Sequence, residues 1–232
     1  MAAYSRALLV VVQSVAYQLA STPPNATPPS ARFDGAHPWY IRIAPTVMKI
    51  QQPLMWLCAL AELSLIAYAP LSRWALSTAT INASDVPVFA TSTTVLGTVL
   101  VVLGAALRLS CFRALGSLFT FDLTILPEHT LVTRRAYAYV RHPAYSGSLS
   151  MIAGLALVNL TPGSWVAECG VLGRGRKGIA VRAIGGAAWW VWWLAVGIRR
   201  CEAEDAQLRK TFGKEWEVYA ARVRYWFIPG VL

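Results

Sequence analysis

The segment 137–147 brings together side chains that could bind a charged ligand, among them His142, Pro143 and Tyr145. Pro143 suits the first turn of a helix, because the N–H that proline lacks would have no partner there. The free N–H groups of such a turn form a positive helix end that favours an anionic group. We therefore expect a helix to begin here and to bind an anion, with Tyr145 placed to hydrogen-bond or stack. A basic, aromatic belt at a membrane interface is the alternative explanation.

A second set of residues recurs at every fourth position near the end of the chain, beginning with Arg200 and Glu204. This spacing predicts one stripe along a helix, on which two ions share an otherwise apolar face. A simple ion pair one turn apart is one explanation. The other is that both side chains bind charged ligand groups. The remaining members of the stripe are Leu208, Phe212, Trp216, Tyr219 and Val223.

The composition indicates what must position these residues. Of 232 residues, 56% are hydrophobic and only 14% are charged, and the mean hydropathy is +0.47. A water-soluble domain uses about a quarter of its residues for charge, so this chain is expected to face lipid. The net charge of +10 comes from basic residues at the ends of apolar runs and in short loops, which favours a membrane surface over nucleic acid.

Five apolar stretches are candidate membrane spans, since about 20 apolar residues cross a bilayer. They are long and do not alternate, so we expect an all-α fold: a multi-spanning integral membrane protein with about five transmembrane helices and a C-terminal amphipathic helical tail. Residues 1–110 would hold spans one to three, and residues 111–232 the catalytic part with a cytosolic loop, spans four and five and the tail. The expected spans are Ala7–Thr22, Ile50–Leu71, Val86–Leu107, Pro143–Ala167, whose helix should end early near Asn159–Gly163, and Ala183–Ile198.

The first stretch also fits a signal peptide, because Arg6 precedes a short apolar run. We expect a retained span. Positive charge in the central loop 111–142 and in the tail from Arg199 predicts that both face the cytosol. Arg174, Arg176 and Lys177 lie between spans four and five, and this topology would place them on the opposite side, which the charge rule does not explain.

The four cysteines do not indicate a disulfide framework or a zinc site. Cys58, Cys111, Cys169 and Cys201 are far apart and form no CxxC or Cys/His spacing. We therefore expect no metal. The last four residues, 229–232, do not form a prenylation box, so we expect no such modification of this chain.

Residues 104–229 contain a series of motifs that together resemble the isoprenylcysteine carboxyl methyltransferase family. The resemblance covers more than half of the chain, and its motifs are specific in combination, although Arg-His-Pro alone would be weak. The motifs are Gly104-Ala105-Ala106-Leu107-Arg108, Leu115-Gly116-Ser117-Leu118-Phe119-Thr120, His129-Thr130-Leu131-Val132, Tyr137, Arg141-His142-Pro143-Ala144-Tyr145-Ser146-Gly147, Arg200, Glu204-Asp205, Leu208, Phe212-Gly213 and Tyr219.

The resemblance implies a membrane enzyme that methylates the C-terminal carboxylate of a prenylated cysteine, with S-adenosyl-L-methionine as the cofactor. Arg200 matches the arginine that holds the substrate carboxylate, which agrees with guanidinium geometry. Arg200 and Glu204 are the expected catalytic residues. The positions expected to bind the cofactor are His129, Thr130, Leu131, Val132, Tyr137, His142, Pro143, Ala144, Tyr145 and Glu204.

The resemblance also implies an endoplasmic reticulum membrane, a site that faces the cytosol, and prenylated CaaX-type proteins and membrane lipids as partners. Three positions depart from the family: Arg135 replaces a common glycine, Asp205 a glutamate and Trp216 a tyrosine. A further cofactor contact ahead of His129 could be either Asp122 or Thr124.

Three other functions are compatible with the sequence. A related membrane methyltransferase could act on a phospholipid amine or another lipid acid. A non-catalytic membrane adaptor could keep the fold without turnover. A membrane reductase would need a nicotinamide cofactor, and the chain contains no GxGxxG fingerprint after a strand to favour it.

Overall fold

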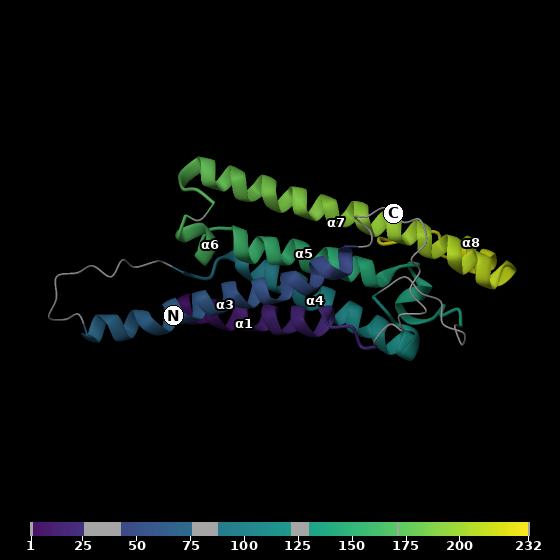
Figure 1. The fold of residues 1–232 in the computed structure, drawn as a ribbon, viewed down its shortest axis with the longest axis horizontal. Helices are drawn as coiled ribbons and strands as arrows, with labels where there is room; N and C mark the ends of the chain where they lie inside the picture. The colour runs from purple at the N-terminus through teal and green to yellow at the C-terminus, as the bar shows by residue number, and fades with distance from the viewer. Residues whose placement is uncertain (1, 26–42, 76–87, 122–129, 171, 232) are drawn as a thin grey trace. The chain divides into compact units, whose positions relative to one another are not determined.

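A computed structural model describes residues 2–25, 43–75, 88–121, 130–170 and 172–231. All regular structure in these ranges is helical, and none of the described residues forms a strand. The predicted all-α fold is therefore confirmed. The elements, with the labels of Figure 1, are α1 (Ala2–Ser21), α3 (Ala44–Ala75), α4 (Ser92–Leu115), the 3-10 turns η2 (Gly116–Leu118) and η3 (Arg135–Ala138), α5 (Pro143–Leu160), α6 (Trp165–Glu168), α7 (Gly175–Phe212) and α8 (Lys214–Arg222).

Within the described residues, four helices are long and apolar enough to cross a membrane: Ala44–Tyr68, Ser92–Leu118, Pro143–Leu160 and Gly175–Phe212. The prediction of about five spans also included the first apolar stretch. That stretch is the 20-residue helix α1, which is not one of the four. Arg6, Gln13 and Gln18 lie within it, and their polarity reduces its suitability for lipid. A multi-spanning protein is confirmed, with four rather than five such helices in the part described.

Several predicted helix boundaries were right and others were wrong. Helix α5 begins at Pro143 and ends at Leu160, as the proline and the polar residues after Val158 indicated. Helix α4 continues to Leu115, so the central loop does not begin at Cys111. Helix α7 is a single 38-residue helix that includes both the expected fifth span and the first part of the tail (Figure 1).

The chain divides into two compact units that both draw on α1, α3, α4, α5 and α7. Unit 1 comprises residues 1–18, 51–102 and 151–190, and unit 2 comprises residues 19–50, 103–150 and 191–232. Each long helix therefore contributes one stretch to each unit. The residues that the sequence singled out for chemistry, from Tyr137 to Tyr145 and from Arg200 to Glu204, all belong to unit 2.

A buried ion pair lies at the centre of unit 1. Arg6 Nε donates to Glu62 Oε2 at 2.8 Å, and its Nη2 donates to Glu62 Oε1 at 2.8 Å. Arg6 Nη1 also donates to Thr94 Oγ1 at 3.0 Å, and Nη2 to the carbonyl of Val158 at 3.0 Å. The backbone N–H of Trp165 completes the set by donating to Glu62. The single acid of the expected second span is thus neutralised inside the protein, as a charge in hydrocarbon requires.

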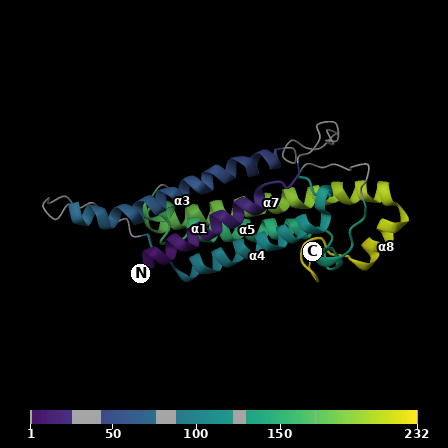
Figure 2. The same cartoon turned by 90° about the horizontal axis from the view of Figure 1, so that it is seen from below.

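In unit 2, the chain reverses direction after α7. Gly213 has a φ of +53°, a left-handed conformation that glycine adopts with little strain, and α8 then runs back from the end of α7 (Figure 2). Elsewhere in this unit, Cys111, Phe112 and Phe119 form a buried cluster against which Tyr137 and Ala144 pack. Because Ala144 belongs to the first turn of α5, this cluster supports the helix start next to His142.

Candidate active site

His142 immediately precedes α5 and is 5% exposed. Pro143, the first residue of the helix, is fully buried. Gly147 lets the start of α5 lie close to α4, since a Cβ at this position would come within 2.6 Å of the carbonyl oxygen of Gly104. Only glycine permits that approach. The sequence therefore places the His142 ring at a fixed point at the buried start of α5.

A chain of hydrogen bonds links Arg200, Tyr145 and Glu204. Arg200 Nε donates to the Tyr145 hydroxyl at 2.9 Å, and that hydroxyl donates to Glu204 Oε1 at 2.5 Å. Arg200 Nη2 also donates to the carbonyl of Phe121 at 2.5 Å. Tyr145 thus lies between the two ions that share one stripe of α7, and its orientation depends on both.

The His142 ring lies between two carboxylates. Its Nδ1 is 3.2 Å from Glu204 Oε2 and its Nε2 is 2.9 Å from Asp205 Oδ1. Burial by itself lowers the pKa of His142, but the Cys201 sulfur and hydrogen bonds to Asp205 and Glu204 outweigh it, and the pKa is raised well above 6.5. The ring is therefore an imidazolium near neutral pH and donates from both nitrogens.

Asp205 is bonded by three side chains of the protein. Besides His142, it accepts from Trp226 Nε1 at 2.8 Å and forms a salt bridge with Arg141 Nη2 at 3.1 Å. Its side chain is 11% exposed, whereas that of Glu204 is 29% exposed. Of the two neighbouring acids, Asp205 is thus held by protein groups, and Glu204 remains more accessible to a ligand.

The segment 223–227 is tied to the start of α5 through the backbone. Arg141 N donates to the Tyr225 carbonyl at 2.9 Å, and His142 N donates to the Trp226 carbonyl at 3.0 Å. Arg141 Nη1 bonds the carbonyls of Val223 and Arg224 at 3.1 Å each. The hydroxyl of Ser146 donates to the Phe227 carbonyl at 2.7 Å. These bonds hold the segment after α8 against the His142 ring.

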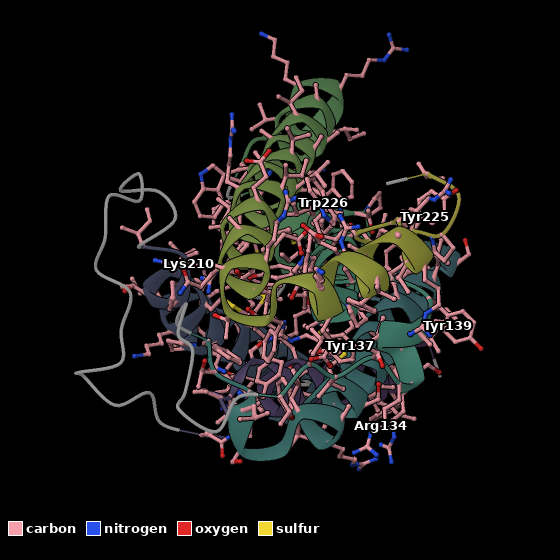
Figure 3. The ribbon with its side chains drawn as sticks, turned by 90° about the vertical axis from the view of Figure 1, so that its right-hand side faces the viewer. Arg134, Tyr137, Tyr139, Lys210, Tyr225 and Trp226 are labelled. Carbon is pink, nitrogen blue, oxygen red and sulfur yellow. The ribbon has the colours of Figure 1, made fainter. Side chains whose placement is uncertain are left out.

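Tyr137 lies among the packed side chains of this unit, while Arg134 and Tyr139 point outward (Figure 3). The Tyr219 hydroxyl donates to the Tyr137 carbonyl at 2.8 Å. Burial raises the pKa of Tyr137 well above 10, and the neighbouring Cys111 and Glu204 raise it further. Burial likewise raises the pKa of Tyr219 to about 12. Both phenols are therefore neutral hydrogen-bonding groups, not bases, at any ordinary pH.

The cluster has an excess of positive charge. With His142 protonated, three cations (Arg141, His142 and Arg200) surround two carboxylates. The ring of Tyr145 also packs edge-on to His142, with centroids 6.0 Å apart. The cluster therefore has a net charge of +1. Its Arg200 guanidinium suits a ligand carboxylate, and the partly exposed Glu204 suits an ammonium group.

The structure brings six of the predicted residues into one cluster or its immediate support, namely Tyr137, His142, Pro143, Tyr145, Arg200 and Glu204. Ala144 packs on the aromatic cluster, and its carbonyl accepts from Arg108 Nη1 at 3.2 Å. Thr130 is exposed, and Leu131 and Val132 are partly buried, and the contacts above do not involve them. His129, Asp122 and Thr124 lie outside the described residues.

Sequence reasoning missed how Asp205, Arg141 and Trp226 participate. The motifs include Asp205 but assign it no role, yet it accepts a hydrogen bond from the indole of Trp226 and contacts both cations of the Arg141-His142 pair. The one signal in the sequence was the adjacency of Glu204 and Asp205. On a helix, two neighbouring residues point about 100° apart, so one acid can face a ligand while the other faces the protein.

Two departures from the family have structural consequences. Arg135 has a φ of +58° and is the one non-glycine residue in that region among the residues described, which explains why glycine is common there. Trp216 Nε1 is buried without a hydrogen-bond partner in the described part of the chain. No group of three or more metal-binding side chains occurs among the described residues.

Residues 95–167, which include the Arg-His-Pro helix start, match a known family. The match is to the isoprenylcysteine carboxyl methyltransferase (ICMT) family. The resemblance inferred from the motifs is therefore confirmed. A "Probable protein-S-isoprenylcysteine O-methyltransferase" of Oryza sativa subsp. indica is 31% identical over 129 residues, which is 55% of this chain and 56% of the relative. A "Protein-S-isoprenylcysteine O-methyltransferase B" of Arabidopsis thaliana is 30% identical over 129 residues, 55% of each chain.

The alignment thus spans about half the length of the curated relatives that it matches. The family segment 95–167 carries His142 and Tyr145 but not Arg200 or Glu204. The latter two come to the first pair in the folded structure through the hydrogen bonds of Tyr145 and His142.

Proposed function

We propose that this protein transfers a methyl group from S-adenosyl-L-methionine to the C-terminal carboxylate of a prenylated cysteine, forming a methyl ester. The observation that carries the proposal is the Arg200–Tyr145–Glu204 chain at the His142 helix start, since it joins a carboxylate-binding guanidinium to an ammonium-binding acid. The similarity to protein-S-isoprenylcysteine O-methyltransferases supports it.

The residues of the cluster fit the amino acid end of the cofactor. Glu204 has a partly exposed carboxylate that would hold the ammonium group. The positive start of α5 would hold the carboxylate. The His142 imidazolium would contribute its charge, since both of its ring nitrogens already bond Glu204 and Asp205. When bound, S-adenosyl-L-methionine supplies an electrophilic methyl group on a sulfonium sulfur. His129, Thr130, Leu131, Val132, Tyr137, Pro143 and Ala144 stay predictions as further contacts.

The reaction needs little proton chemistry from the protein. The substrate carboxylate is ionised near neutral pH because its pKa lies about 3.5, so no general base is required. Transfer would join the carboxylate oxygen to the methyl carbon, and the sulfonium would keep the electron pair of the broken carbon–sulfur bond. The residues of the protein would therefore have no proton to move. The rate must therefore come from positioning and from exclusion of water.

Arg200 is the residue proposed to position the substrate. Its guanidinium carries a planar pair of donors suited to both carboxylate oxygens. It already donates to Tyr145 and to the Phe121 carbonyl, so its plane is fixed before a substrate arrives. Tyr145 also bonds Glu204, and this shared hydroxyl would hold the substrate end and the cofactor end of the site in register.

The membrane explains how the substrate would reach this site. A prenyl group is lipid-soluble and can enter laterally between helices, while the polar cofactor arrives from water. We propose that the site faces the cytosol at the endoplasmic reticulum, with prenylated CaaX-type proteins as substrates and membrane lipids as surroundings. The basic residues of the central loop and of the tail support this orientation.

The decisive experiment uses the purified full chain with methyl-labelled S-adenosyl-L-methionine. A farnesylated cysteine analogue is the first acceptor, a phospholipid mixture the second and unprenylated cysteine the third. The expected product is a base-labile methyl ester on the farnesylated acceptor alone. Label on the phospholipid instead would favour the rival methyltransferase. Cofactor binding without transfer to any acceptor would indicate an adaptor.

A further inference from the structure

A second basic site lies in unit 1, at the connection between α5 and α7. There the chain forms a partly open cavity of about 250 Å³, lined by residues of α6 and of the first turns of α7, which lie near each other (Figure 1). The cavity is lined by Pro162, Ala167, Glu168, Arg174, Gly175, Ile179 and Arg182. None of these residues takes part in the candidate active site.

Positive charge predominates in this lining. Arg182 is 5% exposed, and it is held by bonds to the carbonyls of Leu160 at 3.0 Å and Gly173 at 3.1 Å. Within the described ranges, no salt bridge joins Arg174 or Arg182 to a carboxylate. Glu168, the one acid of the lining, accepts from the backbone N–H of Gly163 at 2.7 Å. A buried arginine bonded only to carbonyls has no carboxylate to balance its charge, and this favours a nearby anion.

The start of α7 adds to this field. Gly175 is its first residue and lines the cavity, and the N–H groups of a first turn have no partner within their helix. They form a positive helix end that stabilises an anionic group. Two arginines and a helix start thus point to a ligand with phosphate chemistry.

The surroundings indicate a lipid as the source of that phosphate. The connection follows one candidate span, Pro143–Leu160, and precedes the next, so it lies where helices meet a membrane surface. Ile179 lines the cavity and is 54% exposed, and Val181 and Ile184 farther along α7 are 52% and 69% exposed. At about 100° per residue these three side chains lie on different faces of α7, so Ile179 adjoins the cavity and acyl chains would pack against the other exposed apolar residues of the helix.

We infer that the cavity binds the phosphodiester of an anionic phospholipid, with Arg174 and Arg182 as its ligands and the exposed apolar residues of α7 beside its acyl chains. This site accounts for the basic residues of the α5–α7 connection, which the charge rule for loops does not explain. It is independent of the methyltransferase proposal, because none of its residues belongs to that site.

The test is a lipid titration of the purified full chain in detergent micelles, read by native mass spectrometry. Phosphatidylglycerol is the anionic probe and phosphatidylcholine of the same acyl chains is the neutral comparison. Arg174→Gln is the main variant, because Arg174 is exposed and its loss does not remove the carbonyl bonds of Arg182. The expected result is about ten-fold weaker binding of phosphatidylglycerol, the loss expected for one charge-assisted bond.

Lys177→Gln is the matched control, because Lys177 is an exposed cation of the same helix start that does not line the cavity. It should bind phosphatidylglycerol as the unaltered protein does. Equal weakening in both variants would mean a diffuse surface charge and overturn the site. Unchanged binding in Arg174→Gln, or equal affinity for the two lipids, would also overturn it. Displacement of the lipid by inorganic phosphate at the same concentration would rule out a lipid ligand.

Discussion

Both units contain a buried arginine near a glutamate, but the two pairs are built differently. In unit 1, Arg6 and Glu62 have side chains 0% and 3% exposed, and each guanidinium nitrogen of Arg6 donates to a carboxylate, a hydroxyl or a carbonyl. In unit 2, Arg200 and Glu204 meet through the hydroxyl of Tyr145, and the side chain of Glu204 is 29% exposed. The first pair is closed by protein, and the second leaves a charged group accessible.

The difference teaches how a structural ion pair can be told from a site. In a closed pair, hydrogen bonds to protein groups already offset the desolvation cost of both ions, so a ligand would have no group left to bind. An open cluster with excess positive charge and a shared hydroxyl gains from a ligand that completes it. Substitutions in the Arg6–Glu62 pair should therefore lower the stability of the fold. Substitutions of Arg200 or Glu204 should instead lower ligand affinity or turnover.

The largest expected effect is on the closed pair. Arg6→Ala leaves Glu62 buried without its cation, and it should destabilise the protein by about 3–5 kcal/mol. Thermal unfolding in detergent would measure it. The control is the double variant Arg6→Met with Glu62→Leu, which removes both charges and should recover most of the loss. A stable Arg6→Ala protein would show that the pair is not closed.

The next effect concerns Arg200. Arg200→Lys keeps the charge but cannot bond both Tyr145 and Phe121 as the guanidinium does. Methyl transfer should fall about 10²-fold, the effect of misplacing a reacting group by roughly an ångström, while cofactor affinity is retained. Arg199→Lys is the control, since Arg199 is an exposed neighbour paired with Glu202, and its turnover should be unchanged. Full turnover in Arg200→Lys would leave Arg200 with only a structural role.

A smaller effect is expected for the accessible acid. Glu204→Gln preserves shape but loses the charge proposed to hold the ammonium group, so S-adenosyl-L-methionine affinity should fall about ten-fold or more, at least 1.4 kcal/mol. Calorimetry measures it directly. Glu202→Gln, a change two residues away at a side chain 45% exposed, should have no effect on affinity. Equal affinities in the two variants would contradict the role of Glu204.

The imidazolium of unit 2 predicts a dependence on pH. The pKa of His142 is raised in the folded protein, so its stabilising charge is fully present below about pH 6.5. This stability is lost as the pH rises through the raised pKa, by up to about 1.4 kcal/mol for each unit of pH. The melting temperature should therefore fall on the alkaline side.

The check is the same melting series on His142→Gln. This variant should lack the alkaline fall, because it has no proton to lose at that position. An identical alkaline fall in both proteins would assign the titration to another group.

The smallest effect comes from backbone strain in unit 2. In the described part of unit 1, the residues with positive φ are all glycines, whereas Arg135 adopts +58° in unit 2. Arg135→Gly should stabilise the protein by roughly 1 kcal/mol or less, the strain relieved minus the chain entropy that glycine loses. Arg134→Gly is the control, because Arg134 has a φ of −107° and should only lose stability. Thermal unfolding distinguishes the two directions.

The sequence predicted those features of the site that depend on local order. Proline chemistry located the start of α5 at Pro143, and the spacing of Arg200 and Glu204 put both on one stripe of α7. It did not predict that His142 would bridge Glu204 and Asp205, because a separation of 63 residues from His142 to Asp205 is bridged only by tertiary packing. The sequence did not predict the pairing of Arg6 with Glu62 for the same reason, since these residues are 56 positions apart.

Helix α7 shows another limit of local reasoning. Charges at Arg199 and Arg200 indicated the end of a span, and the sequence suggested a separate tail beyond it. The residues that follow, such as Ala206, Gln207 and Leu208, are good helix formers, and nothing in them breaks the helix before Phe212. The sequence therefore shows where α7 passes from lipid to water. It does not show that the helix continues unbroken across that boundary.

The attachment of residues 223–227 to the start of α5 has a consequence for biosynthesis. Arg141 and Arg224, which this attachment joins, are 83 residues apart. At about 5–20 residues per second, a ribosome needs several seconds to make the chain between them. During that interval α5 has already been synthesised, but the carbonyls that pair with Arg141 and the indole that bonds Asp205 do not yet exist. The cluster proposed to support methyl transfer should therefore form late and abruptly during translation, after the aromatic residues beyond α8 emerge.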